Sequence, residues 1–271
     1  MRVSATERAM NYAVLLVFGL VILWPLGTIL VTAFGPAKVS EAREGLFHPE
    51  NFVTAWVQGR FGQYLLNSVM VAVVVVVIAT IVSVLAGYAL GTMRFRGSNL
   101  LFYVFLLGIM VPTEAIIIPL FYDLRSMGLT DTLWGVALPQ IAQSTAFGVY
   151  WMRAYFRGVN VSMIEAARID GAGSSRILWQ ILVPTGRPAI TTMIVLFFMW
   201  TWNEFLIPLI MSPSGDFRTA PLSLAFFQGA YTQGTALLAA GAVMVALPIV
   251  ILYFFLQRHF IRGMLEGAVK E

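Results

Sequence analysis

The sequence lacks cysteine and is poor in charged residues. None of its 271 residues is cysteine, so disulfide bonds and cysteine-ligated metal sites are excluded. Only 11% of the residues are charged, whereas a soluble domain carries about 25%. The two histidines, His48 and His259, are far apart in the sequence, so a histidine metal cluster is not expected. No GxxxxGK[ST] stretch is present, which excludes ATP binding by a P-loop on this chain.

What the chain has in abundance is apolar sequence. Hydrophobic residues make up 59% of the total, and the mean hydropathy is +0.83. A membrane-spanning helix needs about 20 mostly apolar residues. The long uncharged runs therefore predict an all-α membrane protein with a single transmembrane domain over residues 1–271. Its six predicted spans are about 11–34, 64–91, 99–122, 133–155, 188–211 and 235–258.

The distribution of basic residues predicts the orientation of these spans. Six spans place both termini on one side of the membrane, and that side receives twelve of the 17 Lys and Arg residues. Cytoplasmic loops carry the excess of Lys and Arg, so both termini and the segment 156–187 are expected in the cytoplasm. The net charge of +4 then indicates cytoplasmic loops rather than a nucleic-acid partner.

The segment 156–187 is a long polar stretch between two strongly apolar spans. Its first helix is predicted at 162–171, because Ser162 and Glu165 have the spacing of a capping box. Gly171 follows, where the backbone can take the positive φ that ends a helix. This helix is the centre of the predicted functional site.

A second short helix is predicted over Arg176–Leu182, with Ser174 or Ser175 as its cap and Pro184 ending it. A pair of short polar helices in a loop of a membrane protein is typical of a segment to which another protein binds. It is equally typical of an amphipathic loop that lies on the lipid surface. The residues alone leave both interpretations open.

The segment resembles the EAA loop of binding-protein-dependent ABC importer permeases, which reads EAA, three residues, Gly, nine residues and I-x-L-P. The matching positions here are Glu165-Ala166-Ala167, Gly171, Ile181 and Val183-Pro184. Val183 replaces the usual Leu. The resemblance implies a type I ABC importer permease fold, whose helix at 162–171 docks onto a cytoplasmic ATPase. The coupling residues that it implies are Glu165, Ala166, Ala167, Asp170 and Gly171.

Further stretches are similar to the carbohydrate branch of that family, in particular to the smaller permease of maltose-type importers. They are Asn67-Ser68, Arg94-Phe95-Arg96-Gly97, Trp202-Asn203-Glu204-Phe205 and the C-terminal residues 257–270. This resemblance implies a non-catalytic subunit without a cofactor of its own in a bacterial or archaeal cytoplasmic membrane. The partners that it implies are a dimer of ATP-binding subunits that holds ATP and Mg²⁺, a second homologous permease, an extracytoplasmic solute-binding protein and a sugar. In that family the larger permease makes most of the direct sugar contacts.

Polar side chains inside the spans are costly and usually functional. Glu114 and Glu204 are predicted to lie at a similar depth in the membrane, because a helix rises about 1.5 Å per residue along each span. A polar layer at this depth is predicted to line a sugar path, with an aromatic ring of Trp200 or Trp202. Its predicted members are Asn67, Glu114, Gln140, Gln143, Trp202, Asn203 and Glu204.

Two alternatives to the sugar path remain open from the residues. The polar layer could instead be hydrogen-bonding glue between helices, with tryptophans as interface anchors. Glu114 and Glu204 could also form the proton relay of a secondary transporter. An intramembrane enzyme is not supported, because no span contains Cys or His with a matching acidic partner.

Overall fold

The computed structural model describes residues 4–36, 47–227 and 235–268, and within these ranges every regular element is helical. The prediction of an all-α chain is therefore confirmed for the part that the structure describes. The chain divides into two compact units. The first unit contains Met1–Gln63 and Ser223–Pro248, and the second contains Tyr64–Leu222 and Ile249–Glu271. Each unit is described by itself below.

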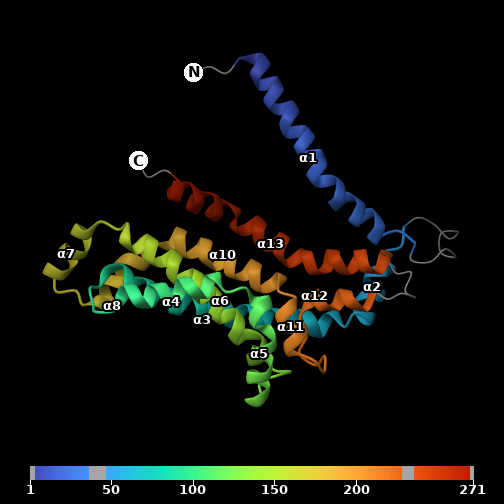
Figure 1. The fold of residues 1–271 in the computed structure, drawn as a ribbon. Coiled ribbons are helices and arrows are strands. Elements are labelled where there is room, and N and C mark those ends of the chain that lie inside the picture. The colour runs from blue at the N-terminus through green and yellow to red at the C-terminus, as the bar shows by residue number, and fades with distance from the viewer. Residues whose placement is uncertain (1–3, 37–46, 228–234, 269–271) are drawn as a thin grey trace. The chain divides into compact units, whose positions relative to one another are not determined.

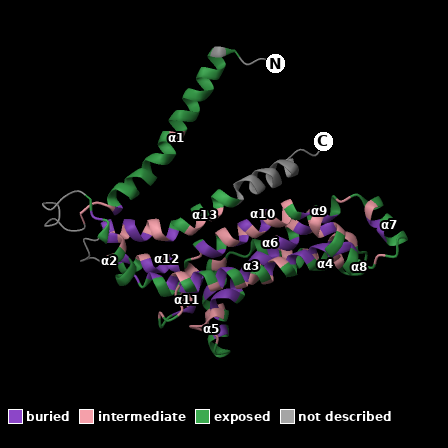
Figure 2. Ribbon diagram, turned by 180° about the vertical axis from the view of Figure 1, so that it is seen from behind, coloured by how far each residue is buried: buried purple, intermediate pink, exposed green. Residues whose placement is uncertain are grey.

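The first unit begins with the long helix α1, Ala5–Ala33. Ser4 and Glu7 form a capping box at its start, with the Ser4 hydroxyl accepting from the Glu7 amide at 3.2 Å and the Glu7 carboxylate accepting from the Ser4 amide at 2.9 Å. Nearly all of the helix is exposed, although its residues are apolar on every side (Figure 2). A helix that is apolar all round is typical of a membrane span, which matches the predicted span at 11–34.

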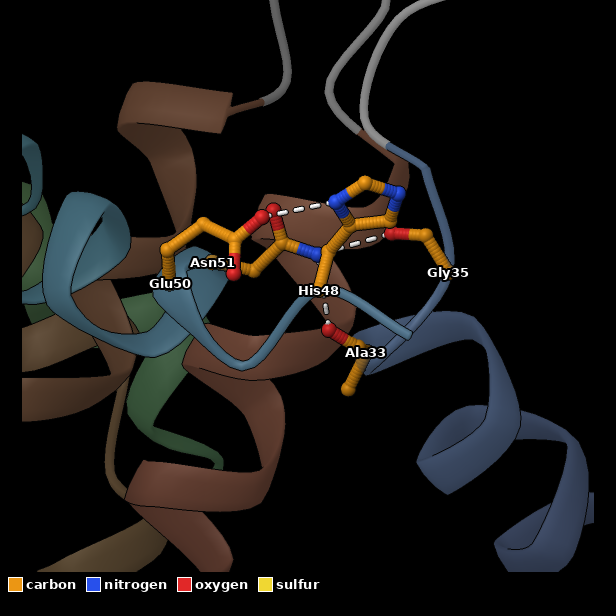
Figure 3. Close-up of polar contacts among 5 residues, drawn as sticks. All are labelled: Ala33, Gly35, His48, Glu50 and Asn51. Atoms are coloured by element: carbon orange, nitrogen blue, oxygen red, sulfur yellow. Dashed lines mark hydrogen bonds and ion pairs between the residues drawn. The ribbon is translucent and has the colours of Figure 1, made fainter. Parts of the chain in front are cut away.

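The end of α1 is held by a side chain from the next helix, α2, Glu50–Gln58. Figure 3 shows the amide of Asn51 directed at two carbonyl groups, and its Nδ2 donates to the Ala33 oxygen at 3.0 Å and to the Gly35 oxygen at 2.8 Å. The last carbonyl groups of a helix have no hydrogen-bond donor within the helix, so the buried Asn51 supplies the donor at the end of α1. The sequence did not predict α2.

His48 reinforces the same junction. Its backbone N–H donates to the Phe34 oxygen at 2.8 Å, and its Nδ1 lies 2.6 Å from Oε1 of Glu50 (Figure 3). A hydrogen bond from the Glu50 backbone amide, and then one from His48, lower the pKa of the exposed Glu50 carboxyl below its ordinary value of 4.5.

The second unit is built around α6, which contacts α4, α10 and α11. The glycines of α3 allow a close approach to α6. A Cβ on Gly87 would lie 2.5 Å from Cβ of Met152, so only glycine fits there. At one end of this unit lie α7 and α8, and α5 and α11 lie toward the other end (Figure 1). The helices named here are α3 Phe61–Thr92, α4 Ser98–Met110, α5 Thr113–Ser126, α6 Leu133–Arg157, α7 Val161–Ile169, α8 Ser174–Arg176, α10 Arg187–Asn203 and α11 Leu206–Met211.

Two of the predicted spans are broken in the structure. The span predicted at 99–122 consists of α4 and α5, bent by 100°. Val111 is extended at the bend, because Pro112 disfavours helical backbone at the residue before it. The span predicted at 188–211 consists of α10 and α11, with an extended Glu204 between them. Each of these two predicted spans therefore consists of two helices in the structure.

Among the residues that the structure describes, three helical segments are long and apolar enough to cross a membrane, and the number is up to five if each of two bent pairs counts as one span. The three are Thr6–Ala33, Phe61–Thr92 and Thr235–Phe255, the last within α13, Thr235–Ala268. The helix α6 agrees with the predicted span at 133–155 in its limits but is not among them. Six spans and cytoplasmic termini therefore remain predictions. The short elements α12, Ala220–Ser223, and η3, Leu224–Phe227, complete the described chain before α13.

Candidate functional site

The helix α7 begins at Val161, after three residues that follow the end of α6 at Arg157, and its N-cap is Asn160. The Asn160 Oδ1 accepts from the Ser162 backbone amide at 3.0 Å and from the Ser162 hydroxyl at 2.8 Å. The predicted capping box of Ser162 and Glu165 is therefore wrong. Ser162 is already inside the helix, and the asparagine two residues earlier is the better cap that the prediction overlooked.

The end of α7 follows the prediction more closely. The helix ends at Ile169, and Gly171 adopts a φ of +77°. The Ala172 amide donates to the Ala167 oxygen at 2.9 Å, and the Gly171 amide donates to the Arg168 oxygen at 3.0 Å. This pair of bonds is the Schellman motif, which requires left-handed backbone at the glycine. The prediction that Gly171 stops the helix by a positive φ is confirmed, although the helix is Val161–Ile169 rather than 162–171.

The two faces of α7 have different surroundings. Ile164 and Ala167 are buried in an apolar cluster that also contains Phe156 of α6 and the segment after the turn. On the other face Glu165 and Ala166 are exposed, and Ile169 is 87% exposed. Of the two alanines predicted to meet a partner, only Ala166 lies on the exposed face. Asp170 and Gly171 are exposed as well.

The segment after the turn is more continuous than predicted. Helical backbone runs through α8, the π-helix η2, Ile177–Leu182, and α9, Val183–Thr185. Gly173 occupies the N-cap position without a side-chain bond, and Pro184 lies inside the helix. The predicted serine cap and the predicted stop at Pro184 are both wrong. Pro184 lies two residues after the end of η2, and the run of helical backbone continues only to Thr185.

A second candidate site is a cavity of about 580 Å³ in the second unit. The cavity lies among α4, α6 and α10, and its size is within the range of small-molecule sites, about 300–1,000 Å³. One side of the cavity is formed by α6, whose four lining residues are spaced three or four positions apart and therefore lie on the same face of the helix. These are Gln140, Gln143, Ser144 and Phe147.

The opposite wall comes from the end of α10, which contributes Met199, Trp200, Thr201 and Asn203, followed by Glu204. Four members of the predicted polar layer thus line one cavity, namely Gln140, Gln143, Asn203 and Glu204. The prediction omitted Ser144, Phe147 and Thr201 from the layer. The spacing along α6 was sufficient to find the first two.

Three members of the predicted layer lie elsewhere. Asn67 donates from Nδ2 to the Arg218 oxygen at 2.9 Å, so it anchors a loop. Trp202 is 2% exposed and stacks on Phe198 with ring centroids 5.4 Å apart. Glu114 is exposed in the first turn of α5 and does not line the cavity. Of the two tryptophans considered, Trp200 is the one that faces the cavity.

Glu204 has a structural task beside the cavity. Its Oε1 accepts from the backbone amides of Leu206 at 2.9 Å and Ile207 at 3.0 Å. These amides open α11, where a negative charge is favoured by the helix dipole. Because Glu204 is engaged in this way and Glu114 lies outside the cavity, the geometry does not support a proton relay between the two carboxylates.

Known proteins are similar to this chain in sequence and in fold. Residues 83–266, more than half of the chain, match the family described as the binding-protein-dependent transport system inner membrane component. The chain belongs to this family of permeases. Its relatives include the arabinooligosaccharides transport system permease protein AraQ of Halalkalibacterium halodurans, 34% identical over 91% of this chain and 91% of the relative. Another is the trehalose transport system permease protein SugB of Mycobacterium tuberculosis, 32% identical over 78% of this chain and 77% of the relative.

The permease also has the fold of a solved structure. A chain from the crystal structure of a bacterial ABC transporter involved in the import of the acidic polysaccharide alginate superimposes with a TM-score of 0.79. The match covers 96% of this permease and 99% of that chain, at 24% sequence identity. At this identity the similarity establishes the fold and not the substrate. The ABC importer permease fold expected from the EAA motif is therefore confirmed.

Proposed function

We propose that this permease is a membrane-spanning subunit of an ATP-driven importer of carbohydrates. Membership of the family supports transport, and the similarity to AraQ and SugB, which belong to transport systems for arabinooligosaccharides and trehalose, supports a sugar as the cargo. The non-catalytic chain works with a pair of ATPase subunits that hold ATP and Mg²⁺, a second homologous permease and an extracytoplasmic solute-binding protein. In this proposal the complex lies in a bacterial or archaeal cytoplasmic membrane.

The observation that carries this proposal is the two-faced packing of α7. Its inner face, with Ile164 and Ala167, shares an apolar cluster with the ends of α6 and α10. Its outer face leaves Glu165 and Ala166 uncovered. Because the packed interior transmits displacement rather than absorbing it, a partner that moves the outer face also moves the longer helices. The exposed Asp170 and the glycine turn at Gly171 complete this coupling surface.

The cavity is the proposed sugar path. Its lining residues Gln140, Gln143, Asn203 and Glu204 present hydrogen-bonding groups, and Trp200 presents an aromatic ring. Closure of the ATPase pair would move α7 and change which side of the membrane the cavity faces. The residues Asn67, Trp202 and Glu114 support the surrounding helices and loops in this proposal rather than the path itself.

The experiment is a detergent pull-down of the tagged permease expressed with its neighbouring transport genes, followed by an ATPase assay. We expect the wild-type chain to bring down an ATPase and a second permease. Glu165→Lys reverses the charge on the outer face of α7, and we expect it to lose the ATPase or its stimulation by sugar-loaded binding protein.

Asp123→Lys is the matched control, because it makes the same kind of charge reversal at an exposed position near the end of α5. We expect wild-type assembly and stimulation in this variant. Wild-type stimulation in Glu165→Lys would contradict the coupling role. A permease that purifies alone and transports sugar without ATP would contradict the proposed function as a whole.

A further inference from the structure

The helical segment after the α7 turn, Ser174–Thr185, has two different faces and is called the elbow segment below. Its residues Ile177, Leu178 and Leu182 are buried in the apolar cluster that also holds Ile164 of α7. A helix with one apolar face in the core and one polar face outside is amphipathic. The coupling proposed for α7 does not use the exposed face of the elbow segment. The residues exposed there include Ser175, Arg176, Trp179 and Gln180.

The direction of the elbow segment follows from the bend at its end. Its axis is bent by 79° from the axis of α10. The bend lies at Gly186, where a Cβ would be only 2.8 Å from Cε1 of Tyr155 on α6, so the packing favours glycine. The span predicted at 188–211 begins with α10, so α10 is expected to run across the membrane. The elbow segment then runs almost parallel to the membrane surface.

Two contacts with α6 indicate the level of this bend. Nε1 of Trp151 donates to the Ala189 oxygen at 3.0 Å, and the hydroxyl of Tyr155 lies 3.4 Å from Oγ1 of Thr185. The helix α6 ends two residues later, at Arg157. Tryptophan and tyrosine are enriched at the membrane–water interface, and basic residues follow on the cytoplasmic side. The bend and the elbow segment are therefore expected at that interface.

The exposed face of the elbow segment combines an aromatic ring with a positive charge. Trp179 is 48% exposed. Nε of Arg176 donates to Oε1 of Gln180 at 2.9 Å, which directs the Arg176 side chain along the helix beside Trp179. Among the residues that the structure describes, no acidic side chain pairs with Arg176. The stretch 174–190 contains Arg176 and Arg187 but no Asp or Glu, so its charge is uniformly positive.

A lipid surface suits this face better than water does. A tryptophan at headgroup level keeps its apolar body in lipid and its N–H in the polar region, whereas in water the ring is left exposed. Basic residues beside it attract anionic headgroups. Helices that lie in the interface combine Lys or Arg with Trp in this way. Figure 2 shows α7 farther out than α8 at this end of the unit, so contact of the elbow segment with lipid leaves α7 accessible to a protein partner.

We propose that the exposed face of the elbow segment lies on the membrane surface and binds the headgroups of anionic phospholipids. Arg176 pairs with the anionic headgroup, and the ring of Trp179 lies between headgroups and acyl chains. This role goes beyond the transport function proposed above and does not depend on the identity of the cargo. The polar segment 156–187 then has two partners, a protein at α7 and the lipid at the elbow segment.

The test uses the full-length chain in lipid nanodiscs with a fluorescent label on one introduced cysteine. The chain has no cysteine of its own, so Ser175→Cys places a single label one turn from Trp179 on the same side of the helix. The quenchers are phosphatidylcholine and phosphatidylglycerol, each with a nitroxide at the headgroup end of an acyl chain, and iodide in the water. Ala166→Cys is the matched control, because Ala166 is exposed on the outer face of α7.

We expect both lipids to quench the Ser175→Cys label, which iodide should not reach, and we expect iodide alone to quench the Ala166→Cys label. Phosphatidylglycerol should be preferred over phosphatidylcholine by about fivefold or more, as for one basic side chain at an anionic surface. Arg176→Gln should reduce this preference by about fivefold. Arg168→Gln makes the same charge change at an exposed position of α7 and should leave the preference unchanged.

Two results would overturn the proposal. If iodide quenches the Ser175→Cys label as strongly as the Ala166→Cys label and neither lipid quenches it, the elbow segment faces water and its exposed face is left to a protein partner. If both lipids quench the label equally and Arg176→Gln changes nothing, the segment touches lipid without binding anionic headgroups. The assay contains no sugar and no ATP, so either failure is distinguishable from a failure of the proposed transport function.

Discussion

The turn after α7 permits a test in which two nearby glycines differ only in backbone conformation. Gly171 has a φ of +77°, whereas Gly173 has a φ of −72° and a ψ of 164°. No atom lies within 4 Å of a Cβ placed at either position. Alanine therefore meets no steric conflict at either site. Any difference between Gly171→Ala and Gly173→Ala must come from the backbone.

The expected magnitude follows from that conformation. An L-residue in left-handed backbone costs about 1–2 kcal/mol, so Gly171→Ala should raise the locally open population of the turn by about 5- to 30-fold. At Gly173 the backbone is extended and open to any residue. Alanine there restricts the unfolded chain but is a poorer N-cap for α8 than glycine, and because these two effects are of similar size the net change in stability should be within about 0.5 kcal/mol.

Trypsin cleavage after the exposed Arg168 reports the open population, because the protease cuts the opened segment when closing is fast. We expect faster cleavage of Gly171→Ala by about the factor above, together with weaker stimulation of the ATPase. Gly173→Ala should be cleaved at about the wild-type rate. Gly171→Asn should fall between, since asparagine tolerates left-handed backbone. Equal cleavage rates for the two alanine variants would refute the role assigned to the turn.

Three further predictions concern stability in detergent, measured by thermal unfolding of the purified chain. Asn51→Leu removes both hydrogen bonds to the end of α1 and should cost about 1–3 kcal/mol, and an unchanged midpoint would show that water replaces them. The pKa of the Glu50 carboxyl is lowered by its own backbone amide and by His48, so the stabilisation that the ionised carboxylate provides is present above pH 4.5 and is lost as the pH falls through the folded pKa. Glu50→Gln lacks this ionisation. Its unfolding midpoint should therefore fall less than that of the wild type when the pH is lowered from about 5 to about 3. Gly87→Ala places a Cβ 2.5 Å from Met152 and should cost about 1–3 kcal/mol, and a neutral result would mean that α3 and α6 separate easily.

Some features of the site could be predicted from local sequence because they depend on local chemistry. Gly171 was predicted as the stop of α7 because only glycine takes left-handed backbone cheaply. The start of the same helix was missed, since Ser162 and Asn160 are both good caps and the choice depends on where the chain leaves α6. Hydropathy located these two apolar runs but not the extended residues Val111 and Glu204 inside them, because it counts composition and does not report backbone conformation.

The polar layer shows the same limit at longer range. Depth along each span was enough to select Gln140, Gln143, Asn203 and Glu204, which share the cavity. Depth was not enough to exclude Glu114, because it says nothing about the direction in which a side chain faces. It also selected Trp202 rather than Trp200, although residues two positions apart on a helix point about 200° apart, toward nearly opposite faces.

The sequence by itself determined the class of this protein. Its apolar runs predicted the helices, and the spacing from Glu165 to Pro184 indicated the permease family, because composition and motif spacing are local properties of the chain. The tertiary structure decided which polar groups meet. Packing of α4, α6 and α10 brought residues more than 60 positions apart in sequence around one cavity, and it left Oε1 of Gln140 and Oγ1 of Thr201 without partners. No local pattern encodes that arrangement, because it depends on how whole helices rotate and pack against one another.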